Sequence, residues 1–113
     1  MGENKKRLYD TNVLIDLVKE GKSPREGYTT TLNLVEYPRA VSLDLSVLIP
    51  SPREYVLAVE LSKKLVKAGT PVPAVDVVIA AVAISRNMTI VTRDRHFSWV
   101  KEIAPGFQLE LLE

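Results

Sequence analysis

Cysteine is absent from the 113-residue chain, and histidine occurs once, as His96. Without cysteine there is no disulfide, no thiolate ligand and no thiol nucleophile, so a secreted, disulfide-stapled fold is not expected. With a single histidine, a multi-histidine zinc site is excluded. A metal ion would therefore be held mainly by oxygen, which favours magnesium or manganese.

Long apolar runs are also missing. No segment approaches the roughly 20 apolar residues that span a bilayer. The first residues, Met1–Arg7, are polar and lack the apolar core of a signal peptide. We therefore expect a cytoplasmic protein that does not contact a membrane. A length of 113 residues with 46% hydrophobic composition fits one globular domain over residues 1–113.

The charges of the chain nearly cancel, with 15 basic and 14 acidic residues and a formal net charge of +1. If four acids are engaged with metal ions, the remaining surface carries an excess of about five positive side chains. Such a surface attracts polyanions, which makes nucleic acid a candidate partner.

Short segments rich in β-branched and aromatic residues alternate with helical patterns. Strands are predicted at residues 6–9, 28–31, 43–49, 89–92 and 107–111, and helices at residues 13–18, 32–41, 52–68, 75–84 and from 97. The clearest boundary is the capping box Ser51-Pro52-Arg53-Glu54, and Gly69 closes the helix that it starts. This alternation predicts an α/β fold, a three-layer α/β/α sandwich around a central, mostly parallel sheet.

Four acidic residues lie beside apolar segments. Asp10 and Asp94 follow predicted strands, Asp76 opens the apolar helix, and Glu36 is predicted near the start of the helix at residues 32–41. The crevice of an open α/β sheet lies beyond the carboxyl ends of its strands, where Asp10, Asp76 and Asp94 can converge. Clustered carboxylates repel one another and are neutralised by a divalent cation. Two such ions roughly 4 Å apart can hydrolyse a phosphodiester, so the pattern favours nucleic-acid hydrolysis.

The segments Asp10–Asp16, Glu36, Asp76–Ala83 and Thr92–Phe97 resemble, in order and spacing, the successive motifs of the PIN domain. The branch that the chain resembles most is that of the VapC-type toxins, and the resemblance runs from about residue 7 to residue 111. It implies a PIN-like fold and a magnesium- or manganese-dependent endoribonuclease. It also implies a homodimer and a toxin–antitoxin pair, in which the tail of an antitoxin protein enters the cleft.

The resemblance also assigns roles by position. The metal-binding, catalytic acids would be Asp10, Glu36, Asp76 and Asp94. The residues that orient them would be Asn12 and Thr92. Three residues around the last acid are candidate contacts to the RNA substrate: Arg93, Arg95 and His96. His96 stands where many relatives carry another acid, so a second ion is expected to bind weakly or only together with substrate.

We therefore predict an enzyme that hydrolyses RNA, in which Asp10, Asp76 and Asp94 hold the principal ion. Glu36 would complete the site or position the attacking water. One alternative is a phosphatase of the haloacid dehalogenase type with Asp10 as nucleophile. That family carries a second aspartate two positions on, where this chain has Asn12. The other alternative is a non-catalytic, PIN-like RNA-binding or scaffolding module.

Overall fold

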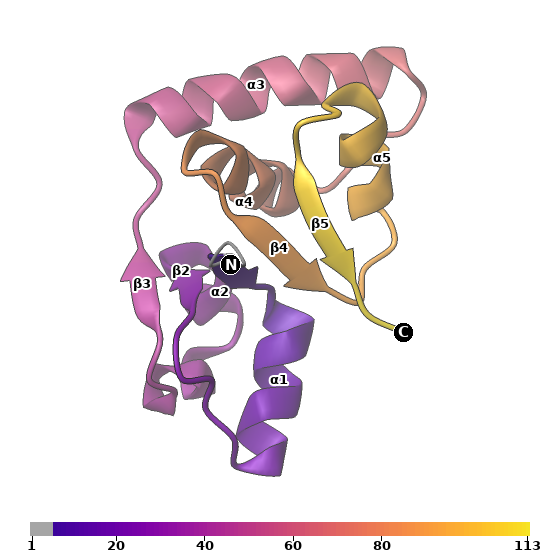
Figure 1. Ribbon diagram of the computed structural model, residues 1–113. Coiled ribbons are helices and arrows are strands. Elements are labelled where there is room, and N and C mark those ends of the chain that lie inside the picture. The colour runs from indigo at the N-terminus through magenta and orange to yellow at the C-terminus, as the bar shows by residue number, and fades with distance from the viewer. Residues whose placement is uncertain (1–5) are drawn as a thin grey trace, which may run out of the picture.

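The computed structural model describes residues 6–113, in which strands and helices alternate along the chain (Figure 1). In chain order the elements are β1 (Arg7–Tyr9), α1 (Thr11–Glu20), β2 (Tyr28–Thr30), α2 (Thr31–Glu36), the 3-10 helix η1 (Pro38–Ser42), β3 (Ser46–Leu48), α3 (Pro52–Lys67), α4 (Ala74–Ser85), β4 (Thr89–Thr92), α5 (Phe97–Ile103) and β5 (Gln108–Leu111). None of the helices in this part of the chain combines the length and the apolar composition that a bilayer-spanning helix needs.

The strands form one five-stranded sheet in the order β3-β2-β1-β4-β5, and every neighbouring pair is parallel. In β1, Leu8 pairs with Tyr28 of β2 on one side and with Ile90 of β4 on the other. The chain moves outward from β1 to β2 and β3, and then returns to the opposite side of β1 at β4. In open α/β sheets the crevice that binds ligands lies at such a reversal of direction, here beyond the carboxyl ends of β1 and β4.

Helices cover both faces of the sheet. Parallel crossovers are right-handed, so the two directions of chain progress place α1 and α2 on one face and α3, α4 and α5 on the other. Accordingly, α1 contacts α2 and η1, whereas α4 contacts α3, α5 and β4. Figure 1 shows α4 beneath α3 at one end of the molecule and α1 at the other. The predicted α/β/α sandwich is confirmed, and all pairings of its sheet are parallel.

The apolar helix predicted at residues 75–84 is the centre of the core. In α4, Val77 and the run Ile79–Ala83 are at most 2% exposed to solvent. Leu61 and Leu65 of α3 and Phe97 of α5 pack in the same cluster. Because α4 is enclosed between the sheet and two helices, a charged residue within it lies either at one of its ends or in a site that uses the charge.

The boundaries of α3 follow the capping residues that predict them. The backbone N–H of Glu54 donates to Ser51 Oγ at 3.3 Å, and the backbone N–H of Ser51 donates to Glu54 Oε1 at 2.8 Å. These two bonds form the predicted capping box, with Pro52 as the first helical residue. After the helix, Gly69 adopts a left-handed φ of +79°, which a residue without Cβ tolerates.

The predicted helix at residues 32–41 was wrong in length. α2 ends at Glu36, and a separate 3-10 helix begins at Pro38. The proline ring disfavours helical backbone in the preceding residue, and Tyr37 has φ −141° and ψ 80°. Glu36 is therefore the last residue of α2 and does not lie near the start of a longer helix. The third strand is also shorter than predicted, since β3 covers Ser46–Leu48.

Candidate metal centre

Two polar side chains lie next to each other at the carboxyl ends of β1 and β4. Asp10 follows β1 directly and Thr92 ends β4. The backbone N–H of Asp10 donates to the carbonyl oxygen of Val91 at 3.0 Å, which continues the pairing of the two strands to this edge. Thr92 Oγ1 then donates to Asp10 Oδ2 at 2.7 Å. The parallel pairing of β1 with β4 thus fixes the position of the first acid.

Asp10 is a buried carboxylate whose side-chain hydrogen-bond donors, within the described part of the chain, are neutral groups. It is 4% exposed. Besides Thr92, Asn12 Nδ2 donates to Asp10 Oδ2 at 3.3 Å and Asn33 Nδ2 donates to Asp10 Oδ1 at 3.2 Å. Burial raises the pKa of Asp10, the bond from Thr92 opposes that rise, and the charges of Glu36 and Asp94 add to it. Within residues 6–113, no lysine or arginine forms an ion pair with Asp10.

Asp76 lies at the same edge of the sheet, in a helix that precedes β4 and runs antiparallel to it. It lies in the first turn of α4, which leads into β4 through residues 86–88 and so runs back along the sheet. The first turn of α4 therefore lies at the carboxyl edge of the strands. The side chain of Asp76 is 16% exposed. Burial raises its pKa, a hydrogen bond with His96 lowers it, and the negative charge of Asp10 raises it.

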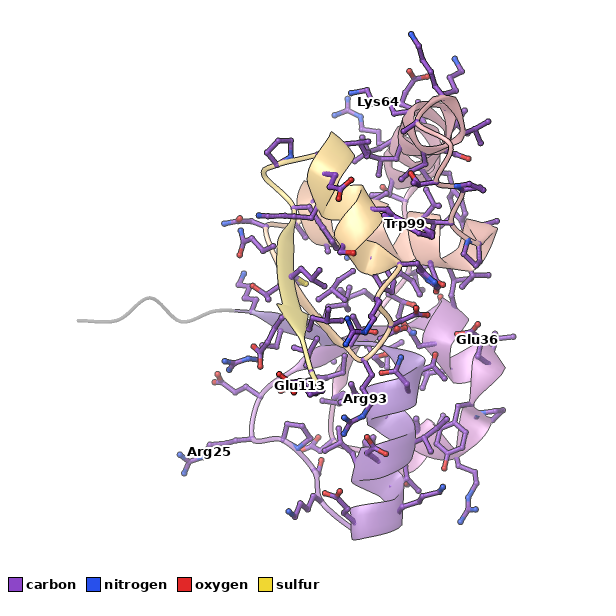
Figure 2. All side chains as sticks on the ribbon, turned by 90° about the vertical axis from the view of Figure 1, so that its right-hand side faces the viewer. Arg25, Glu36, Lys64, Arg93, Trp99 and Glu113 are labelled. Carbon is purple, nitrogen blue, oxygen red and sulfur yellow. The ribbon has the colours of Figure 1, made fainter. Side chains whose placement is uncertain are left out.

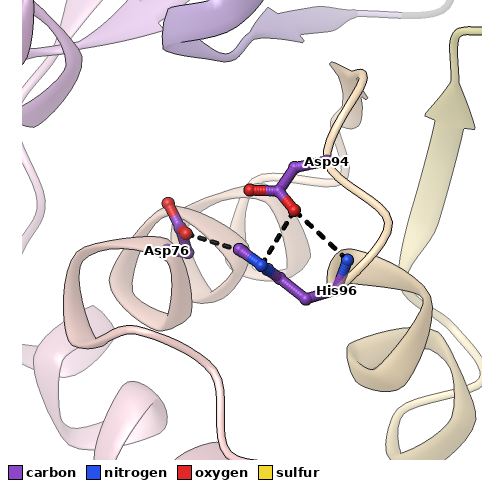
Figure 3. Close-up of side chains that lie close together, drawn as sticks. All are labelled: Asp76, Asp94 and His96. Atoms are coloured by element: carbon purple, nitrogen blue, oxygen red, sulfur yellow. Dashed lines mark hydrogen bonds and ion pairs between the residues drawn. The ribbon is translucent and has the colours of Figure 1, made fainter.

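Asp94 and His96 lie in the loop between β4 and α5. The backbone N–H of Asp94 donates to Thr92 Oγ1 at 3.0 Å, so this hydroxyl connects Asp10 with Asp94. The imidazole of His96 lies between two carboxylates, with Nε2 2.7 Å from Asp76 Oδ2 and Nδ1 2.8 Å from Asp94 Oδ1 (Figure 3). One ligand atom from each of these three residues lies within 4.8 Å of the others.

Glu36 and Asp10 lie outside this group of three. Glu36 is exposed at the end of α2, and its Oε1 accepts a hydrogen bond from Thr11 Oγ1 at 2.6 Å. Its charge nevertheless acts on Asp10, whose pKa it helps to raise. The structure therefore gathers Asp76 and Asp94 around His96. It connects Asp10 to Asp94 through Thr92 and leaves Glu36 at the rim of the crevice, where Figure 2 shows it at the surface.

Asn12 and Thr92, predicted to orient the acids, bond to each other and to Asp10. Asn12 Nδ2 donates to Thr92 Oγ1 at 3.2 Å, and Asn12 Oδ1 accepts from the backbone N–H of Arg93 at 3.0 Å. These contacts tie the first turn of α1 to the loop after β4. Because each carboxylate oxygen of Asp10 receives a hydrogen bond, its orientation is fixed in advance of any ligand.

Asn33 is a site residue that the sequence analysis missed. It is fully buried, and its side-chain amide donates to Asp10 Oδ1 and, at 3.0 Å, to Thr11 Oγ1. Its Oδ1 accepts from the backbone N–H and the hydroxyl of Thr30, which completes a capping box at the start of α2. The detectable signal was the threonine-to-asparagine spacing of three at that helix start.

The arginines after β4 do not enter the group of acids. The Arg93 guanidinium pairs with Asp16 Oδ2 at 2.8 Å and also donates to the carbonyl oxygen of Glu113. Figure 2 shows Arg93 beside α1 with Glu113 close by. Arg95 is exposed. Of the three candidate substrate contacts, only His96 touches the acids of the site.

The donor set fits a divalent cation. Two aspartates from different elements approach each other with a third aspartate nearby, and the pKa of both Asp10 and Asp76 is raised. Oxygen ligands from carboxylates suit magnesium and manganese, and an imidazole nitrogen adds an affinity for transition metals. A cation at this edge would relieve the mutual repulsion of the carboxylates.

Comparisons with known proteins agree with this fold. A family model for the PIN domain matches residues 35–103, which include Glu36, Asp76 and Asp94 but not Asp10. The DNA-bound VapBC structure from Salmonella typhimurium superposes with a TM-score of 0.74 at 23% identity, covering 95% of this chain and 98% of that one. VapBC-5 from Mycobacterium tuberculosis, a toxin–antitoxin system, gives 0.75 at 22% identity, covering 96% and 100%. A search of curated protein sequences gave no match.

Proposed function

The chain belongs to the PIN-domain family, and on this basis we propose that it is a divalent-metal-dependent endoribonuclease of the VapC toxin type. The observation that carries the proposal is the placement of three aspartates at the carboxyl edge of the sheet, where Asp76 and Asp94 lie on either side of His96 and Thr92 connects Asp94 with Asp10. They come from three separate elements, and burial and mutual repulsion raise the pKa of two of them. Such an arrangement opposes folding unless a cation balances it.

The residues of the proposed site divide into metal ligands and residues that orient them. Asp10, Asp76 and Asp94 would hold Mg²⁺ or Mn²⁺, and Glu36 at the rim would complete the site or position the attacking water. Thr92 and Asn12 would keep the Asp10 carboxylate turned into the crevice by the hydrogen bonds already described. When bound, the metal ion supplies an activated water and stabilises the leaving oxygen of the phosphodiester.

The proposed substrate is single-stranded or looped RNA. No nucleophilic side chain is required for hydrolysis, which agrees with a crevice that contains carboxylates and neutral hydrogen-bonding groups. Arg93 and Arg95 precede and follow Asp94 in the chain, and in this proposal they would contact phosphates of the RNA. Arg93 would first have to leave Asp16, an exchange between exposed partners that costs little.

An antitoxin protein and a second copy of the chain are the proposed partners. Solved structures with the same fold include members of the VapBC family, and VapBC-5 belongs to a family of toxin–antitoxin systems. By analogy of fold, an antitoxin would inhibit this chain by occupying the crevice.

The test is cleavage of an end-labelled RNA pool with Mn²⁺ and with EDTA. We expect fragments with Mn²⁺, none with EDTA, and none from Asp10→Asn, which keeps the size of the side chain and removes its charge. The matched control is Asp44→Asn, because Asp44 is exposed and precedes β3 at the other edge of the sheet. Equal cleavage by wild type and Asp10→Asn would contradict the proposal.

A second candidate function is RNA binding or scaffolding without turnover. The observation in its favour is that His96 occupies the space between Asp76 and Asp94, with both ring nitrogens in contact with carboxylates. A gel-shift assay on the same RNA pool separates the two functions. Retardation of intact RNA that is equal in Mn²⁺ and EDTA, without fragments, would favour the binding module.

A further inference from the structure

The imidazole of His96 is held firmly within the group of acids. The next residue, Phe97, is fully buried and anchors the start of α5 in the core. The backbone N–H of His96 donates to Asp94 Oδ1 at 3.3 Å, which fixes the loop from the other side. The ring itself is 21% exposed and lies 5.3 Å, between ring centroids, from the ring of Phe97. Its position therefore follows from the fold.

The two ring nitrogens face different partners. Nε2 is 2.7 Å from Asp76 Oδ2 and Nδ1 is 2.8 Å from Asp94 Oδ1, as the dashed lines in Figure 3 mark. Histidines that bind metals use one nitrogen as ligand and donate the hydrogen of the other to a carboxylate or carbonyl group. In His96 either ring nitrogen can bind a metal ion while the other remains hydrogen-bonded to an aspartate.

We propose that His96 is a direct metal ligand, and that the resulting carboxylate–histidine centre selects Mn²⁺ over Mg²⁺. This inference rests on the proposed metal site and goes beyond it, because the four acids alone do not distinguish these ions. Mg²⁺ is a hard cation that prefers oxygen ligands, whereas imidazole suits first-row transition metals. The nitrogen of His96, set among carboxylate oxygens, therefore shifts the preference of the site.

A spectroscopic test is decisive because the chain has one histidine. Mn²⁺ is titrated into the untagged protein, and electron spin-echo envelope modulation is recorded for the ¹⁴N coupling of a bound imidazole. We expect this coupling in wild type and its loss in His96→Asp, which retains a ligand but supplies only oxygen. His96→Gln serves as a second variant, and circular dichroism in EDTA verifies that each variant folds.

Calorimetry gives the second readout. Changing even the hydrogen-bonded partners of a ligating histidine alters metal affinity by about 10–100-fold. We therefore expect His96→Gln to lose at least about tenfold in Mn²⁺ affinity. In His96→Asp, the ratio of Mn²⁺ to Mg²⁺ affinity should fall by a similar factor, because the oxygen ligand favours Mg²⁺.

The experiments distinguish a site that binds metal without His96 from a chain that binds no metal. If Mn²⁺ binds to wild type and not to Asp10→Asn, but without ¹⁴N coupling and with an unchanged affinity ratio in His96→Asp, the histidine ligand is overturned and the metal site stands. If neither Mn²⁺ nor Mg²⁺ binds to wild type, the metal site itself is refuted, and the inference about His96 falls with it.

Discussion

The ion pair between Glu54 and Arg86 gives the stability prediction that can be worked out in most detail. Glu54 is 2% exposed. Arg86 Nε donates to its Oε2 and Arg86 Nη2 donates to its Oε1, each at 2.8 Å. Arg86 also donates to the carbonyl oxygen of Ile49 at 2.9 Å. The pair thus joins the end of α4 to the start of α3 and to the segment after β3.

The contribution of this ion pair to the free energy of unfolding follows from the pKa of Glu54. The hydrogen bonds from Arg86 lower this pKa from 4.5 to about 2. A difference of this size corresponds to about 3 kcal/mol between the charged and neutral forms. Because the pKa is lower in the folded chain, the contribution is fully present above the unfolded pKa of 4.5 and is lost as the pH falls toward about 2.

The perturbation is Glu54→Gln, measured by urea denaturation in EDTA. We expect the variant to be about 3 kcal/mol less stable than wild type at pH 7, and about 1 kcal/mol less stable at pH 3. The control is Glu60→Gln in the same helix, because Glu60 is 57% exposed and, among residues 6–113, pairs only with Lys63. The Glu60→Gln variant should lose less than about 0.5 kcal/mol of stability. A Glu54→Gln deficit that is equal at the two pH values would refute the reasoning.

Two further predictions concern the hydrogen bonds to Asp10. Asn33→Ala removes the donor to Asp10 and the capping box with Thr30. It should lower the free energy of unfolding by about 1–2 kcal/mol in urea denaturation, and a loss below about 0.5 kcal/mol would contradict this cap. Thr92→Val keeps the shape and removes a donor to the charged carboxylate. It should raise the pKa of Asp10 further, which a carboxyl ¹³C NMR titration in EDTA would measure, and an unchanged pKa would exclude that role.

Much of the site could be predicted from local sequence because its chemistry follows from the strand ends. Asp10 and Asp94 each follow a predicted strand, and the ends of parallel strands meet at one edge. Asp76 stood out because the rest of its helix has no polar face. These arguments require only the period of the hydrophobic pattern and the topology that it implies.

The remainder depends on geometry that such patterns do not contain. The contact of His96 with Asp76 requires the angle between α4 and the loop after β4, which tertiary packing decides. The capping spacing marks Asn33 as the start of a helix, but only the fold brings its buried amide to the Asp10 carboxylate. The predicted place of Glu36 in its helix was wrong because the apolar pattern continues past Tyr37, whereas Pro38 disfavours helical backbone at that residue.

If the acids at the carboxyl edge of the sheet bind a cation, the Asp10→Asn variant loses most of that binding. Burial raises the pKa of Asp10, so at neutral pH its ionised form opposes folding. With Mn²⁺ at about 100 times its dissociation constant, wild type should gain about 2.7 kcal/mol and the variant much less. A Mn²⁺-induced shift of equal size in both proteins would contradict the account.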